Sequence, residues 1–413
     1  MSSSTSSSDA PPPAAPEASG RKIYLRILLL ITLGMGLCMS IFRVFAHLND
    51  VGSDTLLARV QEARAALPRI VAESDDLVMA FGSSMTEAGF SARQFDRQLR
   101  GQGLEVKSFN FGFGGLNPYF QDYLSRRIRE AFVAGDRRLE LALIEFVPFQ
   151  VTTRRFDGAR PVIDSFLTLL ASPEEIWQIT REDPQRGILM ANIRYVRDAI
   201  SAEMTTFHFG SFLRPADPRS SLPEDEELTA RRRQLSEQFN ARFDEDYPDY
   251  EDAEWHYGWQ GAGTIPEERS QATRDMLAEI YETLRTARLL EDDRLRRITC
   301  CDIEELHFEE VLVESFIRMV QNFQQFSNHV EVILLPRNTE WIHYPPEAVE
   351  RMQVVLDRIR SETGVTIRDY QVLEGFSAKM FSDTTHLSRY EGDVAFTAHL
   401  VEEYTPLLAE SLR

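Results

Sequence analysis

The sequence predicts an α/β protein built on a doubly wound, parallel sheet of five strands. From residue 75 onward, short apolar runs alternate with amphipathic stretches, as is typical of strands and helices that follow one another in an α/β chain. Each apolar run is nearly continuous, which indicates strands that are covered on both faces. The helical stretches fall between the runs, so right-handed crossovers place helices on both faces of the sheet.

The first 46 residues precede this pattern and differ from it. Residues 1–20 are rich in Ser, Pro and Ala and predict a disordered tail. Residues 21–46 contain an uncharged run over 27–42 with arginines near both ends. A membrane span needs about 20 residues and terminal arginines can snorkel, so the segment predicts a transmembrane anchor. A buried helix and a cleaved signal peptide are the alternatives, although no small-residue cleavage site follows the run.

Basic residues predict how this anchor is oriented. Arg21, Lys22 and Arg26 precede the apolar run, whereas Arg43 alone closely follows it. Positive charge favours the cytoplasmic side, so the N-terminus is expected in the cytoplasm and the rest of the chain, beyond the anchor, in the periplasm or outside the cell. Residues 47–74 then form a juxtamembrane helix or linker.

The elements of the sheet domain follow in order. The five expected strands are 77–81, 106–111, 139–146, 330–335 and 365–368. The expected helices are 92–100, 119–134, 304–326, 346–363 and 390 to the C-terminus. The sheet domain is therefore expected to comprise residues 75–150 and 300–413.

A long segment separates the third and fourth strands. One crossover does not need so many residues, so 151–299 predicts a mostly helical, acidic insertion. Residues 243–254 (FDEDYPDYEDAE) are its most acidic part, and they lack the ordered ligand spacing and central glycine of a calcium loop. The aromatic residues of 255–259 (WHYGW) suit either the anchoring of the insertion or the stacking of a sugar or peptide.

Composition excludes several classes of function. The formal net charge of -20 disfavours nucleic-acid binding. No glycine-rich nucleotide loop is present, and no cofactor is expected. Cys300 and Cys301 are adjacent, which disfavours a disulfide, and His307 does not complete the spacing of a zinc site. Partly buried free thiols are therefore expected.

Three short blocks carry residues suited to nucleophilic catalysis. Ser84 follows the first strand in a small-residue turn, where a doubly wound sheet places its active site. Residues 110–115 (NFGFGG) end the second strand, and glycine there lets a backbone N–H approach a ligand closely. Asp383 precedes His386 by three residues, ahead of the last helix. Taken singly, each block also suits a helix cap or a tight turn.

Together, the order and spacing of the blocks resemble those of the SGNH (GDSL-like) hydrolases. Residues 82–84 resemble the Gly-Asp-Ser block of that superfamily, with Ser83 in place of the aspartate; residues 110–115 resemble its Asn-x-Gly-x-x-Gly block, and 383–386 its Asp-x-x-His block. The resemblance implies a three-layer α/β/α fold of the SGNH or flavodoxin-like type. It also implies that Ser84 is the nucleophile, His386 the general base and Asp383 the residue that orients it. The N–H groups of Ser84 and Gly115 are then oxyanion donors.

One block of the superfamily is missing. The third strand ends in 144–150 (IEFVPFQ), without the Gly-x-Asn-Asp block that supplies an asparagine oxyanion donor. Losing one such donor costs about 10²–10³ in rate in other serine enzymes. Asn117 is the expected substitute.

Four features are most similar to the D-alanyl transfer (DltD-like) branch and to polysaccharide O-acetyltransferase-type proteins: the Gly-Ser-Ser start at 82–84, the third strand ending at Pro148, the segment 335–338 (LPRN) and the single N-terminal anchor. This resemblance implies a membrane-anchored O-acyltransferase or esterase that acts on a cell-envelope polysaccharide, with an acyl donor, a glycopolymer acceptor and a multispanning membrane O-acyltransferase as partners. A catalytically silent scaffold that binds such a partner or a polysaccharide, and a lipase or esterase on the secreted side, are the alternatives.

Overall fold

The computed structural model describes residues 19–48, 55–159, 163–192, short stretches between 230 and 242, and 270–412. The acidic and aromatic segments 243–254 and 255–259, the tail 1–18 and much of the insertion lie outside these residues. The chain divides into two units, 1–52 with 195–213, and 53–194 with 214–413. The described part of the first unit is the helix α1.

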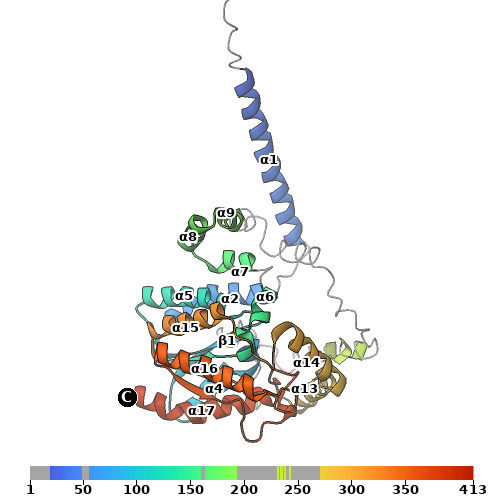
Figure 1. The fold of residues 1–413 in the computed structure, drawn as a ribbon, viewed down its shortest axis with the longest axis vertical. Helices are drawn as coiled ribbons and strands as arrows, with labels where there is room; N and C mark the ends of the chain where they lie inside the picture. The colour runs from blue at the N-terminus through green and yellow to red at the C-terminus, as the bar shows by residue number, and fades with distance from the viewer. Residues whose placement is uncertain are drawn as a thin grey trace, which may run out of the picture. The chain divides into compact units, whose positions relative to one another are not determined.

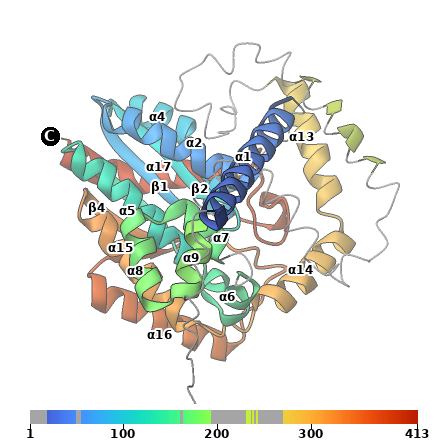
Figure 2. The same ribbon diagram turned by 90° about the horizontal axis from the view of Figure 1, so that it is seen from above.

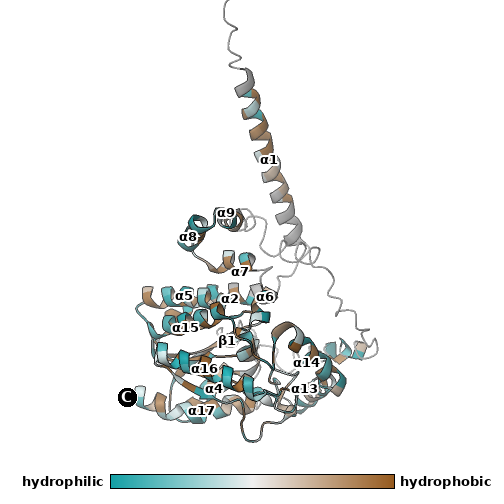
Figure 3. Cartoon of the chain, in the orientation of Figure 1, coloured by the Kyte–Doolittle hydropathy of each residue, from teal (hydrophilic) through white to brown (hydrophobic). Residues whose placement is uncertain are grey.

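Helix α1 spans Ser19–Leu48 and covers the segment predicted as an anchor. It exposes large apolar side chains from Ile23 to Ile41, and Figure 3 shows apolar residues along much of its length. Among the described residues, no helix meets the length and apolarity that a membrane crossing requires. The anchor therefore stays a prediction.

The second unit contains the predicted five-stranded sheet, and all of its strands are parallel. The strands lie in the order β2-β1-β3-β4-β5. Their bounds are Asp76–Ser83 (β1), Val106–Phe113 (β2), Leu139–Glu145 (β3), Ser327–Leu334 (β4) and Thr366–Asp369 (β5). This order confirms the doubly wound α/β class.

The chain reverses direction in the sheet between β1 and β3. From β1 it moves to one neighbour, β2, and it then returns to pair β3 with the other side of β1. Ligands of open α/β sheets bind outside the carboxyl ends of the strands at such a switch point. The end of β1 is therefore the place where this fold favours a site.

Helices cover both faces of the sheet, as Figures 1 and 2 show. Helix α4 contacts α17 on one face, and α5 contacts α15 on the other, where α2 packs against α5 and α16 packs against α15. Their amphipathic faces appear as alternating apolar and polar colours in Figure 3. Their bounds are Thr55–Val71 (α2), Ala92–Arg100 (α4), Pro118–Ala134 (α5), Glu310–Gln324 (α15), Pro346–Thr363 (α16) and Gly392–Ser411 (α17).

The remaining helices are short or belong to the region between β3 and β4. They are α3 (Ser84–Gly89), α6 (Thr153–Ala159), α7 (Ile163–Leu170), α8 (Pro173–Glu182), α9 (Pro184–Asn192), α13 (Gln271–Leu284) and α14 (Ala287–Cys301), with 3₁₀ turns at Pro148–Val151 and Ala378–Met380. The described part of the insertion is thus helical, as predicted.

The helix expected over 304–326 is wrong at its start, because α15 begins only at Glu310. Leu306 adopts a left-handed backbone with φ of 58°, which a continuous helix does not allow. Phe308 then pairs with Thr152 in an isolated antiparallel bridge. This bridge ties the end of the insertion back to the segment that follows β3.

The core lies between the sheet and its helices. Residues 77–81 of β1 are at most 1% exposed, which confirms that this strand is covered on both faces. Phenylalanines fill much of the core, and Phe81 contacts both Phe113 of β2 and Phe323 of α15. Burying one such ring contributes roughly 1.5–3 kcal/mol, so β1 is held firmly beneath the turn that follows it.

Candidate active site

Ser84 lies at the carboxyl end of β1, at the switch point of the sheet. It is the first residue of α3, and Ser83 is the N-cap, whose hydroxyl accepts a hydrogen bond from the Met85 N–H at 3.2 Å. The capping role that a serine in this turn might have thus falls to Ser83. The Ser84 hydroxyl is left to interact elsewhere.

The structure brings Ser84, His386 and Asp383 together as predicted from the sequence. The Oγ of Ser84 lies 2.7 Å from Nε2 of His386, and Nδ1 of His386 lies 2.7 Å from Oδ2 of Asp383. Both distances are those of strong hydrogen bonds. Because 302 positions separate Ser84 from His386 in the chain, the contact is created by the fold and not by local sequence.

A local turn orients the carboxylate toward the imidazole. Oδ1 of Asp383 accepts hydrogen bonds from the backbone N–H groups of Thr385 at 2.7 Å and of His386 at 2.8 Å. The other oxygen, Oδ2, is thereby left for the imidazole. With Nδ1–H donating to Asp383, Nε2 carries the lone pair that can accept the Ser84 proton.

Arg297 of α14 is a second partner of this carboxylate. Its Nη2 donates to Oδ2 of Asp383 at 3.2 Å, and its Nε donates to Asp293 at 2.8 Å. Burial alone would raise the pKa of Asp383, but the hydrogen bonds and charge of His386 and the charge of Arg297 outweigh it and hold that pKa well below its ordinary value. Asp383 therefore stays ionised and can stabilise a positive charge on the imidazole of His386.

A buried glutamate holds the turn that carries Ser84. Glu145, the last residue of β3, accepts hydrogen bonds from the Ser83 N–H at 2.8 Å, from the Ser83 hydroxyl at 2.7 Å, and from the N–H and hydroxyl of Thr86, the former at 2.9 Å. Burial raises the pKa of Glu145, and these hydrogen bonds oppose the rise. A Cβ on Gly82 would lie 2.1 Å from Oε2 of Glu145, so only glycine fits beside this carboxylate.

The glycine block lies against the same turn. A Cβ on Gly114 would lie 3.6 Å from the Cβ of Ser84, and Gly115 has a left-handed backbone with φ of 76°. Arg59 of α2 supports the block by donating to the carbonyls of Gly112 at 2.7 Å and Asn110 at 3.2 Å. The block therefore lies beside Ser84, and the oxyanion-donor role of the Gly115 N–H stays a prediction.

The two asparagines of this region have structural roles. Asn110 donates to the carbonyls of Thr86 and Phe90, at 3.1 and 2.6 Å, and so ties α3 to β2. Asn117 caps α5, and its side-chain oxygen accepts from the Tyr119 N–H at 3.1 Å. Within the described residues, no hydrogen bond joins Asn117 to Ser84 or His386. An oxyanion donor bonds the substrate oxygen and not the triad, so the donor role of the Asn117 Nδ2 stays a prediction.

Two parts of the site were missed from the sequence. Glu145 is a single carboxylate at the end of an apolar strand, and the sequence carries no spacing signal that links it to Ser83 or Thr86. Arg297 and Asp293 lie in the insertion, far from the motif blocks, and no spacing rule links them to Asp383. The insertion therefore contributes directly to the support of the triad through α14.

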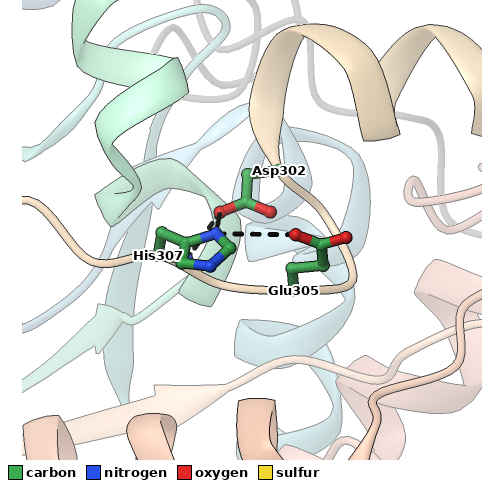
Figure 4. Close-up of side chains that lie close together, drawn as sticks. All are labelled: Asp302, Glu305 and His307. Carbon is green, nitrogen blue, oxygen red and sulfur yellow. Dashed lines mark hydrogen bonds and ion pairs between the residues drawn. The ribbon is translucent and has the colours of Figure 1, made fainter.

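One group of side chains is close enough to hold a metal ion. Figure 4 shows Asp302, Glu305 and His307 together, with Nδ1 of His307 2.7 Å from Oδ2 of Asp302 and 3.7 Å from Oε2 of Glu305. Asp302 also accepts the backbone N–H of His307. These contacts are an ordinary hydrogen-bonded turn and ion pair, and they account for the cluster.

The adjacent cysteines are free thiols, as predicted. Their sulfurs lie 3.0 Å apart, Cys301 is buried and Cys300 is partly exposed. The hydrogen bond from the Cys301 thiol lowers the pKa of Cys300 to about 6, helped by the charges of Arg296, Arg155 and Arg297, whereas the same pairing and burial raise that of Cys301.

Cys300 is therefore expected to be alkylated far more readily than Cys301. In a Cys38→Ser background, the rate of iodoacetamide modification should rise around pH 6 instead of near the value of about 8.5 that is usual for a thiol. Intact mass spectrometry across pH 5–9 measures this rate. Modification that persists in Cys300→Ser, or that rises only above pH 8, would contradict the assignment.

Comparison with protein-family models and with curated proteins found no match to this chain.

Proposed function

We propose that this chain is a serine acyl-transfer protein, an O-acyltransferase or esterase, with an SGNH-like fold and a Ser84–His386–Asp383 triad. The observation that carries the proposal is the continuous hydrogen-bonded chain from Ser84 Oγ through both nitrogens of His386 to Asp383. Its place at the switch point of a doubly wound sheet supports the same reading.

The proposed reaction proceeds in two halves. His386 Nε2 accepts the proton of Ser84 as Oγ bonds to the carbonyl carbon of an ester, and the N–H groups of Ser84 and Gly115 stabilise the resulting oxyanion. The intermediate collapses, the alcohol leaves with the proton from His386, and the acyl group stays on Ser84. A second hydroxyl, from water or a polymer, then loses its proton to His386 and attacks the acyl carbon. The bond from that carbon to Ser84 Oγ breaks, and Oγ regains its proton from His386.

We further propose that the acceptor is a cell-envelope polysaccharide, that the catalytic domain lies outside the cytoplasm, and that a multispanning O-acyltransferase supplies the acyl group. The uncharged run over 27–42, the exposed apolar side chains of α1 and the resemblance to the DltD-like branch support this part.

Transfer is expected to compete with hydrolysis when a suitable hydroxyl is present. The purified full chain is incubated with p-nitrophenyl acetate and envelope oligosaccharides, and the products are analysed by mass spectrometry. The unaltered chain should form acetylated oligosaccharide, and Ser84→Ala should form none. Nitrophenol release with no acetylated product would identify an esterase. If the chain carries out neither reaction, a catalytically silent scaffold is favoured. The capping role of Asn117 and the missing asparagine block also suit such a scaffold.

A further inference from the structure

A pocket lies beside the triad, at the carboxyl ends of β3 and β4. Met85, the residue after Ser84, and Thr385, the residue before His386, both line it. Most of the rest of its wall is apolar and comes from residues 146–149 and 334–336 with Ile342. Its volume is about 350 Å³ when the open solvent at its mouth is included, so the enclosed part has room only for a small group.

Asn338 forms an unusual part of this wall. Its side chain is 1% exposed, and, among the described residues, neither Oδ1 nor Nδ2 has a hydrogen-bond partner. A buried amide with both atoms unpaired costs free energy, and native proteins rarely leave one without a reason. A group that enters the pocket and bonds to both atoms would remove that cost.

The Asn338 side chain is not needed to form its own turn. Its backbone carbonyl accepts the N–H groups of Trp341 at 3.2 Å and Ile342 at 2.9 Å, which holds residues 338–342 without the amide. Gln371 donates to Asp369 at 3.2 Å, and the Thr385 hydroxyl donates to Asp383 at 3.3 Å. Arg337 donates to the Ile342 carbonyl, and its Nε is buried without a partner among the described residues. Asn338 thus offers a ligand both an unpaired donor and an unpaired acceptor, whereas Arg337 can only donate.

The free atoms and the neighbouring charge select the chemistry of that ligand. An ammonium group would satisfy only Oδ1 and would lie near the guanidinium of Arg337, which also lines the pocket and stacks on Tyr344. A carboxylate would satisfy Nδ2 but would repel Oδ1. A hydroxyl accepts from Nδ2 and donates to Oδ1 at once.

We propose that this pocket binds a short acyl group with a hydroxyl substituent, and that Asn338 determines this specificity. The inference rests on the proposed acyl transfer at Ser84, because the acyl group enters the pocket when its carbonyl carbon lies at Ser84 Oγ. Asn338 contacts the acyl substituent and takes no part in the proton transfers.

Two esters that differ only in this substituent test the proposal. p-Nitrophenyl glycolate has a hydroxyl where p-nitrophenyl propionate has a methyl, so the purified full chain should show a kcat/KM about 10-fold or more higher for the glycolate. Asn338→Leu should lower this ratio to that of the hydroxide-catalysed hydrolysis of the same two esters, which measures their intrinsic reactivity. Asn338→Asp, which keeps an acceptor, should give an intermediate ratio. Asn328→Leu, an exposed control, should leave the ratio unchanged.

Equal turnover of the two esters by the unaltered chain, or a ratio that Asn338→Leu does not change, would overturn the pocket assignment while the proposed acyl transfer stands. If neither ester is turned over, saturation-transfer NMR with the unreactive amides decides separately. Glycolamide should then receive saturation from the unaltered chain and from Ser84→Ala but not from Asn338→Leu, and propionamide should receive little from any of them. No transfer to glycolamide would mean that the pocket holds water alone and would overturn the inference.

Discussion

His386→Ala is expected to lower kcat for ester turnover by about 10⁴–10⁶, and Ser84→Ala should have a similar effect. The reason is the 2.7 Å contact between Ser84 Oγ and His386 Nε2, because without the imidazole nothing removes the proton as the oxygen attacks. The two residues act as one unit, so the double variant should be no slower than either single variant. Steady-state kinetics with p-nitrophenyl acetate measure all three.

A matched histidine separates this effect from damage to the fold. His307 also pairs with an aspartate, at 2.7 Å, but it lies outside the site, so His307→Ala should keep the turnover of the unaltered chain. Two results would contradict the account. One is a fall in kcat of less than about 10-fold in His386→Ala. The other is a fall in the double variant equal to the product of the falls in the two single variants, which would mean that the residues act independently.

The second large effect is expected at Glu145. Glu145→Ala removes a fully buried acceptor and leaves the N–H groups of Ser83 and Thr86 without a partner, so it should lower the free energy of unfolding by about 3 kcal/mol or more. Because the same turn carries Ser84, kcat should fall together with stability. Glu145→Gln keeps one acceptor oxygen, so its free energy of unfolding and its kcat should lie between those of Glu145→Ala and of the unaltered chain.

Urea unfolding and steady-state kinetics on the same preparations check this prediction. Glu350→Ala, at an exposed position on α16, is the control and should change neither quantity. If Glu145 positions Ser84 as well as stabilising the fold, Glu145→Gln should lower kcat and change KM little under conditions where the variant is fully folded. A Glu145→Ala protein as stable and as active as the unaltered chain would remove Glu145 from the account.

The sheet could be predicted from sequence because its strands are nearly continuous apolar runs bounded by polar residues. Residues 77–81 predict a covered strand, and all five are buried. The start of α15 could not be predicted, since residues 304–309 are compatible with a helix and it is the left-handed backbone of Leu306 and the bridge at Phe308 that exclude one. Those features depend on contacts that a single segment does not encode.

The candidate site could also be predicted only in part. Ser84, Asp383 and His386 could be predicted because each lies in a short block beside a predicted strand or helix. Glu145 and Arg297 could not, because their partners lie 59 or more positions away and one carboxylate or guanidinium in a segment carries no pattern. The side-chain oxygen of Asn117 caps α5, which its position just before Pro118 also suits, and the oxyanion-donor role of its Nδ2 stays a prediction.

Labelling with a serine-directed fluorophosphonate tests the central claim most directly, namely that His386 activates Ser84. Intact mass and peptide analysis of the full chain should show one adduct on Ser84, with strongly reduced labelling in His386→Ala and none on residue 84 in Ser84→Ala. Absence of labelling at Ser84 in the folded, unaltered chain, or equal labelling with and without His386, would contradict the account.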